Sequence, residues 1–236
     1  MIIRRTTRQI RLGDLLIGGG APISVQSMTN TDTADTEKTA EQIHRLEAAG
    51  CEIIRVAVPD LEAARSLRVI REAIAIPLIA DIHFDWRLAV AAMEHGAQGI
   101  RINPGNLGGP DNLQQVVDAA AQHQVPIRVG VNSGSIEKDL LERHGYPTAD
   151  NPQALIESAV RNVQLVEGFG YHEMKVSIKS ADVLTTINAY RALSETLDYP
   201  LHLGVTEAGG LIGGTVKSSV ALGILLSEGI GDTLRI

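Results

Sequence analysis

The sequence has few aromatic residues, a single cysteine and no long apolar run. Aromatic residues make up 3% of its 236 residues, so aliphatic side chains must fill most of the core. The lone cysteine, Cys51, excludes an intramolecular disulfide and fits a cytoplasmic location. The apolar runs are too short to cross a bilayer, and the N-terminal residues lack the apolar stretch of a signal peptide. We therefore expect no membrane association.

The chain also lacks an excess of positive charge. It has 21 Lys and Arg against 28 Asp and Glu, which gives a formal net charge of −7. A negative protein repels nucleic acid and anionic membranes, so neither is an expected partner. A local group of arginines can still bind a small anion. The length and the 44% hydrophobic content suit a large globular domain, and we assign residues 1–236 to a single one.

Strand-like and helix-like segments alternate along almost the whole chain. We expect strands near 23–28, 53–58, 77–83, 99–103, 126–132, 173–179, 200–206 and 231–236. We expect helices near 36–49, 61–73, 86–95, 111–123, 152–169, 182–197 and 213–228. This order predicts the α/β class and a (β/α)8 TIM barrel rather than an open doubly wound sheet. Residues 1–20 are expected to form an N-terminal β-hairpin closing the bottom of the barrel. No eighth helix follows the last strand, so we expect a fragment of a longer protein.

Several predicted strands have one apolar face and one polar face. In residues 126–132, three aliphatic residues alternate with Arg128, a glycine and Asn132. Residues 99–103 and 173–179 alternate in the same way. Because helices must cover the apolar faces, the polar faces must point into the barrel. A polar interior is costly unless its groups pair with one another or with a ligand.

Cationic and amide side chains stand near the ends of these strands, which a parallel barrel gathers at one rim. The candidates for binding a phosphorylated small molecule are Arg55, Arg101, Asn103, Arg128, Asn132, Lys175 and Lys179, and Arg235 ends the last strand. Guanidinium groups match phosphate oxygens as a fork, and lysine adds a point charge. The alternative is that each arginine pairs with a core carboxylate, but we expect Asp81 to neutralise only one of them. Three arginines on the polar faces of three strands therefore favour an anion site.

Acidic residues and glycine-rich loops complete the candidate site. Asp81 and His83 share a strand face, but two ligands are too few for a protein-only metal site. We assign no metal there and expect this pair to order a substrate hydroxyl or to contact Arg101. Glu207 follows the seventh strand and is the candidate acid or base, unless it is a solvated loop residue. Loops 101–112 and 209–214 either bind an anion through backbone N–H groups or are flexible connections.

Seven stretches, taken in order, resemble the N-terminal barrel of the hydroxymethylbutenyl diphosphate synthase family, of the non-mevalonate isoprenoid pathway. They are SVQSMTNTDT (24–33), ADIHFD (80–85), RINPGN (101–106), RVGVNSGS (128–135), KVSIKSADV (175–183), HLGVTEAGG (202–210) and LLSEGIGDTLR (225–235). The resemblance implies reductive ring opening of methylerythritol cyclodiphosphate, with electrons from ferredoxin or flavodoxin passing through a [4Fe–4S] cluster. It also implies the roles of the site residues: Arg55, Arg101, Arg128 and Lys179 clamp the diphosphate, Lys175 supports Lys179, Asn103 and Asn132 orient the substrate, and Glu207 lies next to the reacting carbon.

The resemblance also indicates a missing part. In the family, a C-terminal domain supplies three cysteines and a glutamate to the cluster, and a homodimer places it against the partner's barrel. One cysteine cannot hold such a cluster. We therefore expect the iron–sulfur domain to be absent, no cluster to be bound, and the fragment to be inactive alone. Two alternatives stay open: a transferase barrel of the dihydropteroate synthase type, for which few aromatics are available to stack a pterin, and a non-catalytic dimerisation module.

Overall fold

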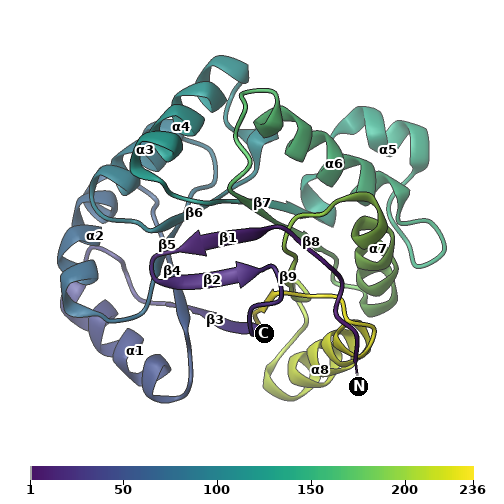
Figure 1. Cartoon of the computed structure of the whole chain (residues 1–236), viewed down its shortest axis with the longest axis horizontal. Coiled ribbons are helices and arrows are strands. Elements are labelled where there is room, and N and C mark those ends of the chain that lie inside the picture. Colours follow the sequence, from purple (N-terminus) through teal and green to yellow (C-terminus); the bar gives the residue numbers. More distant parts are fainter. Residues whose placement is uncertain (1) are drawn as a thin grey trace.

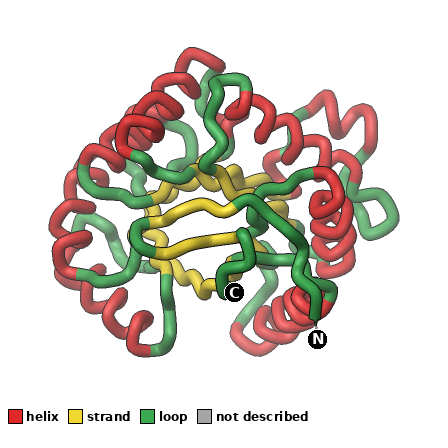
Figure 2. Tube along the Cα trace, viewed as in Figure 1, coloured by secondary structure: helices red, strands yellow, loops and turns green. Residues whose placement is uncertain are grey.

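The computed structural model describes residues 2–236, which form a parallel barrel surrounded by helices (Figure 1, Figure 2). Its strands are β3 (Ser24–Met28), β4 (Ile53–Ala57), β5 (Leu78–Asp81), β6 (Gly99–Ile102), β7 (Ile127–Asn132), β8 (Met174–Lys179), β9 (His202–Leu203) and β10 (Thr233–Leu234). They pair in the order β8-β7-β6-β5-β4-β3-β10-β9. A parallel bridge between Val176 and Leu201 joins β8 to the chain entering β9. The predicted TIM barrel is confirmed.

Seven helices begin and end within two residues of their predicted limits. They are α1 (Thr36–Ala48), α2 (Leu61–Ala73), α3 (Trp86–Glu94), α4 (Pro110–His123), α6 (Gln153–Glu167), α7 (Val183–Thr196) and α8 (Leu211–Ser227). Aspartates define four of the starts: the side chains of Asp35, Asp60, Asp85 and Asp182 each accept a bond from a backbone N–H in the first turn. None of the helices among residues 2–236 is long and apolar enough to cross a membrane.

The structure adds one α-helix that the sequence pattern did not predict. Helix α5 (Lys138–His144) follows β7 and the short 3-10 turn η2 (Ser133–Ser135). It has only seven residues, which is too short for a periodic apolar pattern to stand out. Its Asp139 accepts two hydrogen bonds from Arg161 of α6, at 3.0 and 2.8 Å, and its Leu140 is buried. Contacts with α6 therefore hold this turn of helix in place.

The last two strands are shorter than predicted. The expected strands 200–206 and 231–236 are reduced to β9 and β10, with two residues each. The reason lies in Asp232, whose side chain accepts the Leu201 backbone N–H at 2.8 Å. We call the junction of β3, β9 and β10 the seam. At its start, the Asp232 side chain takes the place of a backbone acceptor on a neighbouring strand. Beyond it, Arg235 N still donates to Leu203 O at 3.1 Å, so the chain stays extended without a regular ladder.

A hairpin closes the N-terminal end of the barrel, as predicted. Strands β1 (Gln9–Leu12) and β2 (Leu15–Gly18) pair antiparallel and lie across the barrel in Figure 1. Ile10, Leu12 and Ile17 pack against Ile53 of β4 and Ile79 of β5, and all five side chains are 2% exposed or less. The hairpin and these two isoleucines form an apolar floor beneath the barrel interior.

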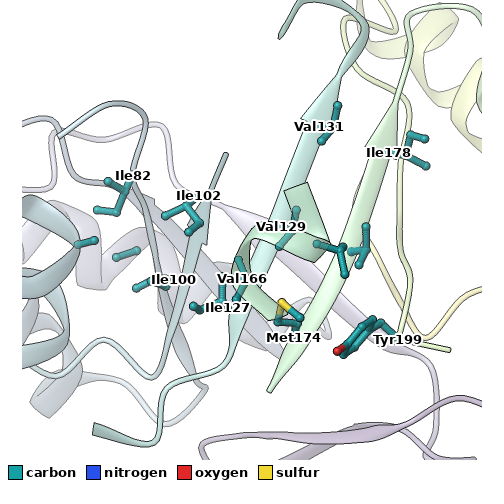
Figure 3. Close-up of a cluster of buried hydrophobic side chains, with 14 of the residues drawn as sticks. Ile82, Ile100, Ile102, Ile127, Val129, Val131, Val166, Met174, Ile178 and Tyr199 are labelled. Carbon is teal, nitrogen blue, oxygen red and sulfur yellow. The ribbon is translucent and has the colours of Figure 1, made fainter. Parts of the chain in front are cut away.

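The main core lies between the strands and the surrounding helices. Ile100 and Ile102 of β6 and Ile127, Val129 and Val131 of β7 are buried there and lie on the outer faces of their strands (Figure 3). The alternating residues Arg101 and Arg128 point inward. The predicted reversal of the usual pattern, with aliphatic residues outside the strands and polar residues inside, is confirmed for these strands.

Candidate functional site

A cavity of about 390 Å³ opens at the carboxyl ends of the barrel strands. Its lining is Met28, Arg55, Asp81, His83, Arg101, Arg128, Asn132, Ser177, Lys179, Val205, Thr206, Glu207, Arg235 and Ile236. Eight of the ten candidate residues from the sequence therefore lie on one surface. We call this space the rim cavity. None of the described residues that line it is Phe, Tyr or Trp.

The other two candidates, Asn103 and Lys175, do not line the rim cavity. The Asn103 side chain accepts the Gly105 backbone N–H at 3.3 Å and caps the 3-10 turn η1 (Pro104–Asn106). Asn103 therefore has a local structural role at the start of η1. Lys175 lies deeper on the same face of β8 as Lys179, and it is only 2% exposed.

Asp81 bridges two arginines, one of which is the expected partner Arg101, although its single negative charge offsets only one of theirs. Its carboxylate lies 3.6 Å from Arg55 Nε and 3.4 Å from Arg101 Nη1, and His83 Nε2 is 3.3 Å away. Strand pairing explains this, because Asp81 stands on β5 between β4 and β6, directly beside Arg101. Burial opposes ionisation of Asp81, but Arg55 and then Arg101 outweigh it and lower its pKa.

The other cations that line the rim cavity have no acidic partner of this kind among residues 2–236. Arg128 is 2% exposed, and its Nη1 donates only a long bond, 3.4 Å, to Ser177 Oγ. Burial, followed by the charges of Arg55 and Arg101, lowers the pKa of Arg128. Burial and then Arg128 lower the pKa of Lys179 well below its usual value. The rim cavity is therefore a site of strong positive potential, suited to an anion with several oxygens.

Two glycines that the sequence reasoning did not single out make room for these cations. A Cβ on Gly130 would lie 2.7 Å from Arg101 Nε, and one on Gly204 would lie 2.6 Å from Lys179 Nζ. Any side chain at either position would displace the cation beside it. Their signal in the sequence is a glycine at an inward-facing strand position, which exposes backbone and lets a long neighbour cross the barrel.

Glu207 reaches the rim cavity from a strained backbone position. Its φ angle is 50°, and Gln124 is the other described non-glycine residue with a positive φ. This left-handed conformation costs a non-glycine residue about 1–2 kcal/mol. Strain of this kind occurs at functional sites, where the surrounding structure fixes the geometry. The candidate acid or base is thus held at the mouth of the cavity.

We expect Glu207→Gly to raise the free energy of unfolding by up to about 1 kcal/mol, because glycine removes the left-handed strain. Gln124→Gly is the matched control, since its φ of 55° ends α4 far from the cavity. Urea unfolding should show a similar gain for both variants, and only Glu207→Gly should change ligand binding. A gain for Gln124→Gly with a loss for Glu207→Gly would show that the Glu207 side chain stabilises the empty site.

The described residues do not fit a [4Fe–4S] cluster. Among residues 2–236 no group of three His, Cys, Asp or Glu side chains is placed to hold a metal ion. Cys51 lies just before β4, at the end of the barrel opposite the rim, and its Sγ donates to Ile53 O at 3.0 Å. Burial raises the pKa of this thiol. Cys51 is a buried structural cysteine.

Residues 7–236 match the family model described as the GcpE TIM-barrel domain. The chain belongs to this GcpE barrel family. It is 68% identical over 236 residues to 4-hydroxy-3-methylbut-2-en-1-yl diphosphate synthase (flavodoxin) of Desulfotalea psychrophila, and 61% identical to the protein of the same name from Lawsonia intracellularis. Both matches include the whole chain and 65% of the relative. This GcpE barrel thus spans about 65% of the length of these curated relatives.

Solved structures of other enzymes share the fold of this GcpE barrel. The dihydropteroate synthase of Yersinia pestis superposes with a TM-score of 0.68 at 13% identity, covering 96% of this chain and 90% of that one. The 3-dehydroquinate dehydratase of Geobacillus kaustophilus gives a TM-score of 0.65 at 14% identity, covering 98% and 88%. Identities this low show a common barrel architecture and nothing about the ligand.

Proposed function

We propose that this chain is the substrate-binding barrel of a hydroxymethylbutenyl diphosphate synthase, and that it binds methylerythritol cyclodiphosphate in the rim cavity. The observation that carries the proposal is the charge of the cavity. Four arginines and Lys179 line it, and Asp81, the buried carboxylate among them, is shared by Arg55 and Arg101. A cyclic diphosphate supplies the negative charge that the cavity lacks.

Each lining residue has a role that its position supports. Arg128 and Lys179 bind phosphate oxygens, because both are buried and neither has an acidic partner at ion-pair distance among the described residues. Arg55 and Arg101 are held in place by Asp81 and turn their remaining N–H groups to the ligand. Asn132, at the end of β7, orients a ligand oxygen. Glu207 holds or accepts a proton at the mouth, where the carbon skeleton of the ligand would lie.

Reduction of this substrate requires electrons that the described residues do not carry. The printed names of the relatives specify flavodoxin, and ferredoxin is the other candidate donor. We propose that iron–sulfur ligands outside this chain complete the site, that the assembled enzyme is a cytoplasmic homodimer, and that this chain alone binds the substrate without reducing it. The low identity to dihydropteroate synthases and a cavity lining without Phe, Tyr or Trp do not favour a pterin ligand.

Calorimetric titration tests this function directly. We expect the chain to bind methylerythritol cyclodiphosphate at one site per chain and not to bind dihydropterin diphosphate. We also expect no product when a strong artificial reductant is added. Preferential binding of the pterin would support a transferase. Failure to bind any small anion would support a dimerisation module. Sustained product formation by this chain alone would contradict the proposed division of the site.

A further inference from the structure

A second set of polar side chains lies inside the barrel, below the rim cavity. We call it the inner cluster, and its members are Ser24, Gln26, Lys175, His202 and Thr233, each 2% exposed or less. Strand pairing places Thr233 opposite both Ser24 and His202. It also places Lys175 beside Arg128, whose guanidinium lines the rim cavity above. The inner cluster is therefore continuous with the floor of the anion site.

The polar atoms of the inner cluster are largely unpaired. Lys175 Nζ, both ring nitrogens of His202, the side-chain amide of Gln26 and the hydroxyls of Ser24 and Thr233 have no hydrogen-bond partner among the described residues. Buried polar groups without partners cost stability, and most proteins have only a few. A concentration of them in one place indicates a use other than holding the fold together.

The charges around the inner cluster are nearly all positive. The barrel walls present Arg55 from β4, Arg101 from β6, Arg128 from β7, Lys179 from β8 and Arg235 after β10. The acids on these walls are Asp81 of β5, which already contacts two arginines, and Glu207 at the mouth, where His83 also lines the cavity. Strand β3 contributes only neutral side chains, Ser24 and Gln26 in the inner cluster and Met28 at the rim cavity. Lys175 therefore faces cations without a carboxylate of its own.

Repulsion of this kind is relieved at the groups that release protons most readily. Guanidinium groups stay protonated in proteins, so the release falls on lysine and histidine. Burial, then Arg128 and Arg55, lowers the pKa of Lys175 to about 7. Burial and then Arg128 also lower the pKa of His202 well below its usual value. The empty barrel thus limits its own positive charge.

We infer that Lys175 takes up a proton when a diphosphate anion enters the rim cavity. The positive charge that this adds to the inner cluster neutralises part of the negative charge of the bound anion. This inference rests on the proposed function and deepens it. Lys175 does not line the rim cavity, so it acts on the ligand through charge and not through contact. Lys179 differs, because it lines the cavity and its removal would delete a contact.

The sign of the pH dependence follows from these positions. An anion nearby favours the protonated amine and raises the pKa of Lys175 in the complex. Above pH 7 the amine is mainly neutral in the empty chain and charged in the complex, so binding takes up a proton and weakens as the pH rises. Well below pH 7 the amine is charged in both states, and the uptake disappears.

Calorimetry in two buffers of different ionisation enthalpy measures the number of protons taken up. We propose titrating inorganic pyrophosphate and methylerythritol cyclodiphosphate separately into the wild-type chain and Lys175→Met at pH 7.5. Methionine keeps most of the volume and removes the amine. We expect Lys175→Met to bind both ligands but to take up roughly half a proton less than the wild type. The difference between the two proteins cancels any ionisation of pyrophosphate itself.

Each result supports or overturns the inference. Equal proton uptake by wild type and Lys175→Met, with binding intact, would overturn it. If the variant takes up fewer protons than the wild type on binding pyrophosphate, and neither protein binds the cyclodiphosphate, the result would support proton uptake by Lys175 and contradict the proposed function. Binding of neither ligand to the wild type would contradict both. If the variant does not fold, the wild-type affinity decides: an affinity for cyclodiphosphate that does not change between pH 6 and 8 would overturn the inference.

Discussion

Replacing Arg128 by methionine should weaken cyclodiphosphate binding by roughly 10- to 150-fold, which corresponds to about 1.5–3 kcal/mol for a bond to a charged group. The same change should leave the melting temperature of the unliganded chain unchanged or higher. Arg128 is buried among cations, and its contact with Ser177 Oγ is 3.4 Å long. Methionine fills most of its volume and removes the repulsion. Calorimetric titration and thermal unfolding measure the two effects.

Arg68→Ala is the control, because Arg68 is exposed on α2 and far from the rim cavity. It should change neither affinity nor stability. The two readouts together separate the roles that a buried arginine can have. A clear fall in the unliganded melting temperature of Arg128→Met, with unchanged affinity, would show that Arg128 serves the fold and not the ligand.

Replacing Asp232 by alanine should lower the free energy of unfolding by about 1–3 kcal/mol, because it leaves the buried Leu201 N–H without its acceptor and removes the acid from a partly buried ion pair with Arg4. The Asp232 carboxylate accepts from Arg4 Nη2 at 3.0 Å and from the Leu201 backbone N–H at 2.8 Å. Its backbone also pairs with Ser24 and Leu201. The residue therefore connects the N-terminal segment to the seam where β3, β9 and β10 meet. Chemical denaturation measures the loss.

Asp198→Ala provides the matched comparison. Asp198 pairs with Arg8 at 2.8 Å, but the two side chains are 59% and 41% exposed, so its loss should cost less than about 1 kcal/mol. Asp232→Asn should fall between the two, since an amide oxygen can still accept the Leu201 N–H. If Asp232→Ala costs no more than Asp198→Ala, the seam is held by its backbone contacts and Asp232 is dispensable.

The repeating part of the fold could be predicted from the sequence, and the seam could not. Aliphatic and polar residues alternate so regularly in 126–132 and 173–179 that strand positions and inward faces follow directly. Aspartate caps and apolar spacing place the helix ends. The seam depends on the Asp232 carboxylate replacing a strand partner for Leu201. Helix α5 is placed by its buried Leu140 and by the pairing of Asp139 with Arg161 of α6. Both are contacts between distant parts of the chain, which local patterns do not encode.

The candidate site shows the same division. Arg128 and Lys179 were predicted from their strand faces, because period-two alternation decides which side chains point inward. A contact of Asp81 with Arg101 was among the predictions, but its second partner, Arg55, was missed, because it depends on which strands are neighbours in the barrel. Gly130, Gly204 and His202 were missed for a different reason. Their importance comes from what they leave room for or leave unpaired, and a small or neutral residue in a strand gives little sign of that.

The hairpin at the base of the barrel has a consequence for the order of events at the opposite end. Ile10, Leu12 and Ile17 pack against Ile53 and Ile79, so the hairpin closes the end of the barrel opposite the rim cavity, and a ligand enters from the rim. Any macromolecule that docks over the rim would therefore trap a ligand already inside and exclude one that arrives later. With such a partner, the small molecule would bind first and leave last.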